Sequence, residues 1–312
     1  MPGSQEYPSA SIAFDSHTHR WPGYALNLCS AVAFYFATVM VHLGVQSGPT
    51  GPRVYVFARF LTGFIIFGLP YLLRRQPVER GADSIPFIAL RSIYNLAAVL
   101  CFYQAVATGA TGKGNVLNMT YPAFVALIAP WLIGERLNSR KIILVLISVV
   151  GVLMNFIDDD FGLQPDNVRP YIWAVASAVT AGVAIVSLRG AALNAPSGEI
   201  LFWMFLSGTV VLLPTIFTKI SQITLIEYPY ILGSAALGIA GQWCLTASYR
   251  YIDAATGSIV SVTRIPIALL FGVVLLSEEM HLLAWLGALL ILLSNVLLAF
   301  RTNHEKVGVV GK

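Results

Sequence analysis

Ten long apolar runs constrain the fold of this chain more than any other feature of its sequence. Most of them are close to 20 residues long, the length of helix that crosses the hydrocarbon core of a bilayer. Every backbone polar group inside a bilayer must be bonded within its own segment, so the runs are predicted to be helices. The predicted spans are 23–45, 54–73, 86–107, 112–133, 140–157, 170–188, 200–218, 229–250, 255–276 and 282–300.

A soluble core helix would explain any one of these runs, but it does not explain ten. Only 11% of the 312 residues are charged and 57% are hydrophobic. Soluble domains have about 25% charged residues. A soluble protein of this composition could not cover its surface with polar groups, so we predict an all-α integral membrane protein.

One segment of the chain is an internal repeat that occurs twice. Pro122 precedes Glu135 by thirteen residues, and Pro266 precedes Glu279 by the same thirteen. Each copy encloses an apolar run and follows a group of small residues. The repeat divides the chain into a polar tail (1–22), a first repeat (23–157), an acidic connecting loop (158–169), a second repeat (170–301) and a C-terminal tail (302–312).

The two repeats are predicted to enter the membrane in opposite senses, because each contains five spans, an odd number. Such inverted repeats are found in many secondary transporters, which bind substrate near the membrane midplane between the halves. With the N-terminus in the cytoplasm, inner segments hold twelve lysines and arginines and outer segments four. This positive-inside bias predicts that both termini are cytoplasmic.

Three arginines lie within predicted spans, whereas every Asp and Glu falls in a loop, in a tail or at a span end. A charge at the bilayer centre costs roughly 2.5–3.5 kcal/mol, so it usually faces a partner or a wet cavity. Arg59 and Arg91 lie near span ends, where snorkelling to the headgroups explains them equally well. Arg264 lies near mid-span, and we expect it to face a cavity and pair with a substrate carboxylate.

Polar residues recur at helical spacing on four predicted spans, and residues three or four apart share one face. These stripes predict a shared substrate cavity, although hydrogen bonds between membrane helices would explain single residues of them. Candidates for an aromatic wall beside the stripes are Tyr94, Tyr103, Trp203 and Trp243, although aromatics near span ends more often form an interface belt. The predicted substrate-binding residues are Arg264, Arg91, Asn95, Asn115, Asn118, Tyr121, Gln242, Trp243, Tyr249 and Ser261.

The repeated prolines and glutamates have separate predicted roles. Pro122 and Pro266 are expected to bend matching helices in mid-span and act as hinges for a rocking motion. Glu135 and Glu279 close their spans and are interpreted as helix-end charges. Replacing either with glutamine should then leave transport largely intact, whereas a loss of flux would indicate gating or ion coupling.

The same segments resemble the ten-helix EamA type of the drug/metabolite transporter superfamily, over about residues 23–300. The resemblance is carried by Pro122 with Gly134 to Leu137, Pro266 with Glu279, Arg59 with Phe60, and Phe102 to Ala105. Arg91, Arg189, Gly241 with Gln242 and Tyr249 with Arg250 also resemble a subgroup that includes S-adenosylmethionine-type carriers. The resemblance implies movement of small organic solutes across the inner membrane, through a cavity formed by spans one, three, four, six, eight and nine.

The predicted function is therefore that of a secondary transporter, not an enzyme, with a small polar metabolite as substrate. The metabolite bears a carboxylate, and an amino acid or amino-acid derivative fits best. An exporter of a drug-like or siderophore-like compound and a non-transporting membrane scaffold or sensor are the alternatives. No cofactor, metal site or nucleic-acid partner is predicted; the lipid bilayer is the expected surrounding, and a homodimer stays open.

Overall fold

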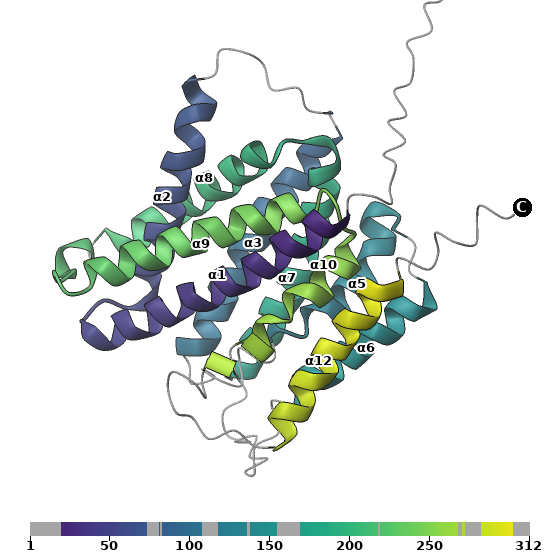
Figure 1. Cartoon of the computed structure of the whole chain (residues 1–312). Helices are drawn as coiled ribbons and strands as arrows, with labels where there is room; N and C mark the ends of the chain where they lie inside the picture. The colour runs from purple at the N-terminus through teal and green to yellow at the C-terminus, as the bar shows by residue number, and fades with distance from the viewer. Residues whose placement is uncertain are drawn as a thin grey trace, which may run out of the picture.

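The computed structural model describes residues 20–73, 81, 83–107, 118–135, 138–154, 169–217, 219–267, 270–271 and 282–301. All regular elements in these ranges are helices (Figure 1). They are α1 (Arg20–Ser47), α2 (Pro52–Leu73), α3 (Ser84–Ala107), α5 (Tyr121–Ile133), α6 (Ser139–Met154), α7 (Arg169–Asn194), α8 (Ser197–Ile216), the short 3-10 helix η1 (Ile220–Gln222), α9 (Tyr228–Ser248), α10 (Ala254–Ser261) and α12 (Leu282–Arg301).

Six of the described helices are long and apolar enough to cross a membrane: α1, α2, α3, α7, α8 and α9. Two shorter apolar segments, Tyr121–Ile133 and Trp285–Ser294, lie in α5 and α12. Many large apolar side chains on these helices are exposed, among them Trp131 and Leu69. An outer surface of this kind suits lipid contact, because lipid tails are as apolar as leucine.

The helices pack in pairs that join the two predicted halves of the chain. α1 lies along α9, α2 along α8, α3 along α7, α6 along α12, and α5 contacts α10 (Figure 1). The α2–α8 pair is closely interlocked: the Phe205 ring lies over Gly63, and the Phe60 ring lies over Gly208. The two rings meet edge to face with centroids 5.8 Å apart. Glycine lets the two backbones come this close.

A buried carboxylate joins the loops at one end of these pairs. Glu227, which immediately precedes α9, is fully buried. One carboxylate oxygen accepts hydrogen bonds from the backbone N–H and hydroxyl of Thr50, and the other accepts from the same two groups of Thr224. Glu227 therefore ties the α1–α2 connection to the α8–α9 connection. It lies just outside the helix, in keeping with the absence of acids from predicted mid-spans.

Both repeated prolines follow a break in the helix, so the predicted mid-helix bends are wrong. Met119 and Thr120 form a turn, after which α5 begins, with Pro122 as its second residue. In the second copy α10 ends at Ser261, Val262 and Thr263 form a turn, and helix resumes over 264–267, around Pro266. Proline has no N–H and a fixed φ, so it fits the first turn of a helix better than its interior.

Candidate functional site

A cavity of about 580 Å³ lies between the helix pairs and the two interrupted segments. This volume is in the range of small-molecule binding sites. α1, α2, α3, α7 and α9 contribute to its wall, together with the residues on either side of the breaks. The predicted site residues that line it are Arg91, Asn95, Asn118, Tyr121, Gln242, Ser261 and Arg264.

Arg59 also lines the cavity, although its place near a span end made snorkelling an equally good prediction. Its Nη2 donates to Gln242 Oε1 on α9 at 3.0 Å, and its guanidinium lies 5.0 Å from the centre of the Phe34 ring. The side chain crosses α9 at Gly238, where an added Cβ would lie 2.8 Å from Arg59 Cδ. These contacts hold the charge inside the bundle, and the glycine leaves room for it.

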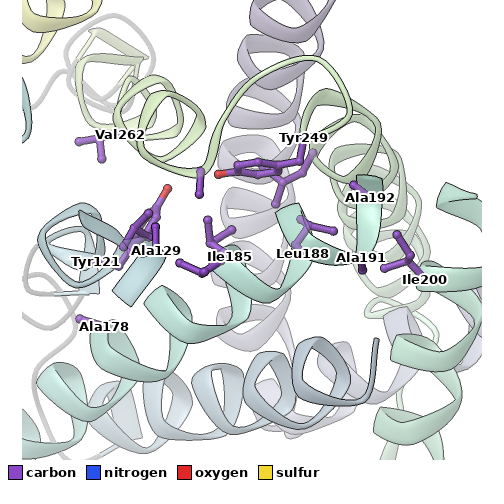
Figure 2. Packing of buried hydrophobic residues seen from close by; sticks show 14 of the residues in the cluster. Tyr121, Ala129, Ala178, Ile185, Leu188, Ala191, Ala192, Ile200, Tyr249 and Val262 are labelled. Atoms are coloured by element: carbon purple, nitrogen blue, oxygen red, sulfur yellow. The ribbon is translucent and has the colours of Figure 1, made fainter. Parts of the chain in front are cut away.

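Arg91 is the most deeply buried of the three arginines, with only 2% of its surface exposed. Among the described residues its Nε has no hydrogen-bond partner. Tyr249, Tyr121 and Arg59 are the titratable groups near it. Figure 2 shows Tyr249 above Leu188 and Ile185, with its hydroxyl directed toward the side where Tyr121 lies.

Arg264 is half-buried at the start of the resumed helix. Within the described part of the chain, its one hydrogen-bond acceptor is Met119 Sδ, 2.9 Å from Nη2. A thioether is a weak acceptor and carries no charge. None of the described residues that line the cavity is Asp or Glu. The cavity therefore holds three guanidinium groups and no carboxylate of its own among these residues.

Three further polar residues of the wall form hydrogen bonds between helices. Asn118 Nδ2 donates to Ser177 Oγ at 2.6 Å, and Ser261 Oγ donates to Asn27 Oδ1 at 2.7 Å. The Tyr121 hydroxyl donates to the carbonyl of Ser258 at 3.2 Å. These residues combine both roles that the stripes suggested, because they line the cavity and also hydrogen-bond across helices.

Three predicted site residues are not part of the described wall. Trp243 is 46% exposed and does not line the cavity, since it occupies the outer face of α9. Tyr249 is fully buried behind the wall, where its ring packs on Gly257 and beside Arg91. Asn115 lies outside the described residues. Gln242 and Trp243 are neighbours in the sequence, and both were predicted to face the cavity. Helical spacing alone did not show that Gln242 lies on the inner face of α9 and Trp243 on its outer face.

A second group of charges lies where α5 approaches α10. α5 ends at Gly134 in the left-handed conformation, φ 64°, which glycine adopts without strain. The next residue, Glu135, accepts a hydrogen bond from the backbone N–H of Ala254 at 3.2 Å. Lys141 Nζ pairs with Asp253 at 2.9 Å beside it. Burial, with the nearby Asp253 charge, raises the pKa of Glu135 to about 7.

Glu135→Gln should leave transport largely intact, because the amide oxygen can still accept the Ala254 N–H. The pKa of Glu135 is higher in the folded protein than in the unfolded chain, so the folded state holds the proton more tightly. The stability this confers is present below the unfolded pKa and is lost as pH rises through about 7. The melting temperature of wild type should therefore fall more steeply with rising pH than that of Glu135→Gln.

Thermal unfolding from about pH 5 to 8 measures this difference, with Asp83→Asn, a change at an exposed acid, as the matched control. Asp253, Lys141 and Arg189 contribute charges at the same place, and all three are retained in both variants. Parallel melting curves for wild type and Glu135→Gln would contradict the raised pKa. A complete loss of flux at normal expression would assign Glu135 to gating or ion coupling.

Comparison with known proteins gives a consistent family. The model of the EamA-like transporter family matches residues 21–157 and 168–300. The pseudopaline exporter CntI of Pseudomonas aeruginosa is 28% identical over 240 residues, which cover 76% of this chain and 81% of that protein. An uncharacterized transporter of Helicobacter pylori is 26% identical over 285 residues, 88% of this chain and 91% of the other.

A solved structure, titled only as the crystal structure of a protein, matches the fold with a TM-score of 0.71. It shares 16% sequence identity and covers 90% of this chain and 98% of its own. At this identity the likeness concerns the fold alone. The two family matches span most of the chain, and apolar helices line the cavity. The chain belongs to the EamA-like transporter family of the drug/metabolite transporter superfamily, and it is a membrane transporter and not an enzyme.

Proposed function

We propose that this protein is a secondary transporter that moves a small polar metabolite with a carboxylate across the inner membrane by alternating access. The observation that carries the proposal is the cavity with three arginines and no acid among its described lining residues. A guanidinium pairs with a carboxylate through two parallel hydrogen bonds. An amino acid or amino-acid derivative suits the cavity best, because amide side chains of Asn95 and Gln242 can bind its remaining polar groups.

In this mechanism the substrate acid group pairs with Arg264 and Arg91. The amino end of α5 lies beside them at Tyr121 and has no side-chain cap. Its helix dipole adds positive potential at the same place. Broken helices whose amino ends face an anionic group are a common way for transporters to build a midplane site. Substrate binding would then offset the cost of holding the Arg264 and Arg91 charges in the bundle.

The pairing of helices supports an architecture of ten spans in two inverted five-helix repeats. An operation that exchanges the halves turns the α1–α9 pair into the α7–α3 pair. The same operation leaves α2–α8 and α6–α12 in place. The turns before Pro122 and Pro266 border the cavity, so small backbone rotations there would let one half rock against the other. Pro122 and Pro266 thus keep a proposed hinge role at the breaks.

The proposed orientation has both termini in the cytoplasm, in accord with the distribution of lysines and arginines. A cysteine introduced as Asp160→Cys, in a variant without the three native cysteines, should react with an impermeant reagent added outside intact cells. A cysteine introduced as Arg75→Cys should be protected. The reverse pattern of labelling would overturn this orientation.

Export of a metallophore-like compound is the second candidate. It is favoured by the 28% identity to a pseudopaline exporter over most of both chains. A metallophore exporter and an amino-acid importer would differ in cargo and in direction of transport, but both would use the same cavity. A membrane sensor would bind a solute without moving it.

Reconstitution distinguishes these functions. A metabolite screen comparing uptake and efflux in cells with and without the protein selects the solutes. Each solute is then tested on purified protein, first for a shift in melting temperature and then for flux into and out of liposomes. We expect a carboxylate-bearing solute to give both the shift and the flux. Solute-dependent stabilisation without flux would contradict the transporter and support the sensor.

A further inference from the structure

We infer that Asn27 is a positioning residue for Arg264: its side-chain amide fixes the end of α10, and thereby the direction in which the Arg264 guanidinium meets the substrate carboxylate. Asn27 lies on α1 and is not among the described residues that line the cavity. Its role rests on the proposed function, because Arg264 is the arginine to which the acid group is assigned there.

The amide of Asn27 is buried and fully bonded. The residue has 0% of its surface exposed. Its Nδ2 donates to Ser248 Oγ at 3.3 Å and to the carbonyl of Gly257 at 3.2 Å, and its Oδ1 accepts from Ser261 Oγ at 2.7 Å. An amide has two N–H donors and one acceptor oxygen, so each of them has a partner here. One side chain of α1 thus joins the last residue of α9 to two residues of α10.

The two contacts on α10 fix how this helix is turned about its axis. Gly257 and Ser261 are four residues apart, so they lie on one face of the helix. An amide that bonds both positions resists rotation of α10 as well as its separation from α1. α10 has only 8 residues. Helices shorter than about 12 residues are marginal on their own, so the placement of α10 depends on such contacts.

Backbone hydrogen bonds link the end of α10 firmly to Arg264. The N–H groups of Val262 and Thr263, which form the turn, each donate to a carbonyl of α10 at 3.1 Å. The N–H of Ile265 then donates to the carbonyl of Val262 at 2.9 Å. The turn is therefore not a free swivel, and a rotation of α10 changes the direction of the Arg264 side chain.

Arg264 needs this support because little else in the described residues orients it. Its hydrogen-bond acceptor is the Met119 thioether, which is weak and uncharged. Two parallel hydrogen bonds to a carboxylate require the planar guanidinium to be correctly turned. Binding groups must be held to about 0.5 Å for such contacts, usually by hydrogen bonds of the residues behind them. Asn27 supplies this restraint from the α1 side, and the Tyr121 hydroxyl, which donates to the Ser258 carbonyl, supplies one from α5.

The preference for an acid over its amide measures the orientation of Arg264. The probes are the standard amino acids, each with its α-carboxamide, titrated calorimetrically into the purified full-length protein. At least one amino acid should bind wild type about ten- to a hundredfold more tightly than its carboxamide, the usual gain from a charged pair. Asn27→Ala should lower this preference about tenfold, the loss of one charged hydrogen bond. Arg264→Ala should lower it little further in the Asn27→Ala background.

Two controls separate positioning from a general loss of stability. Glu227→Ala removes a buried, hydrogen-bonded side chain at another place in the bundle, the tie between Thr50 and Thr224. It should lower the melting temperature and keep the wild-type preference. Ser248→Ala removes only the α9 partner of Asn27 and leaves both contacts on α10. It should also keep the preference.

Ser261 provides an independent pair of variants, which serves even where Asn27→Ala does not assemble. Ser261→Ala removes only the hydrogen bond between Asn27 and the end of α10, and it should lower the preference. Ser261→Thr retains the hydroxyl and should restore it. In the Asn27→Ala background Ser261→Ala should cost little more, because the bond is already lost. A wild-type preference in Ser261→Ala would overturn the positioning role.

The outcomes distinguish this role from the proposed function. A lower melting temperature in Asn27→Ala with a wild-type preference would show that Asn27 only holds helices together, and it would leave the carboxylate transporter intact. Additive losses for Asn27→Ala and Arg264→Ala would overturn the role in the same way. So would an equal loss of preference in Glu227→Ala. Amino acids that bind wild type no better than their carboxamides would overturn both the proposed substrate class and the role of Asn27.

Discussion

Arg264→Ala is expected to weaken substrate binding by about ten- to a hundredfold, because each charged hydrogen bond contributes roughly 1.5–3 kcal/mol. The variant should assemble normally: the partner it leaves behind is the Met119 thioether, which is not a charge. Arg264→Lys keeps the charge without the planar fork and should recover only part of the loss. Titration of purified wild type and variants with the solute selected by the flux screen measures these affinities.

A ligand-side change makes this expectation specific to the carboxylate. An ester or amide of the true substrate should bind wild type weakly and lose little more on Arg264→Ala, because both changes remove the same pair. This comparison is a double-mutant cycle with one arm on the ligand. If the two losses simply add, Arg264 does not contact the acid group, and its role is to hold the resumed helix against the turn at Met119.

Glu227→Ala should lower the free energy of unfolding by about 2–5 kcal/mol, the cost of leaving buried donors without their charged acceptor. Four donors from Thr50 and Thr224 depend on this carboxylate, and Thr50 is itself only 1% exposed. The loops that it ties together would separate more easily at that end of the bundle. Thermal unfolding of the purified variant measures the effect, and liposome flux shows whether that end still closes.

Matched variants identify the lost interaction at Glu227. Asp83→Ala, at an exposed acid, should leave the melting temperature unchanged. Glu227→Gln should fall between wild type and Glu227→Ala, because an amide offers one acceptor oxygen and directs its NH₂ group toward another donor. An unchanged melting temperature in Glu227→Ala would show that water replaces the carboxylate, and that the two loops are held by packing alone.

The apolar length of the runs correctly predicted helices in the described residues, because backbone polar groups in a bilayer must be bonded within their own segment. Helical spacing also brought Arg91, Asn95, Gln242 and Arg264 to one cavity. The failures are local. A proline within an apolar run is consistent with either a bend or the start of a new helix. The turns at 119–120 and 262–263 show that a new helix starts near each proline.

Burial of polar groups was harder to predict, since it depends on contacts between distant segments. Arg59 is packed against Phe34, Gly238 and Gln242, and the last two lie about 180 positions from it in the sequence. In the sequence Glu227 has the features of an ordinary loop acid. Only the structure shows its hydrogen bond with Thr50. The sequence alone does not show these pairs, because no local pattern links residues on α1 or α2 with residues on α9.

The pairing of α1 with α9 also determines when α1 can pack during biosynthesis. About 200 residues separate the starts of these two helices, and ribosomes add about 5–20 residues per second. Once translated, α1 therefore waits about 10 to 40 seconds for the helix against which it packs. During that interval its inner face, including the buried Asn27, must be shielded by lipid, by a neighbouring segment or by the insertion machinery. The first half of the chain is thus incomplete on its own, and most of its helix packing awaits the second half.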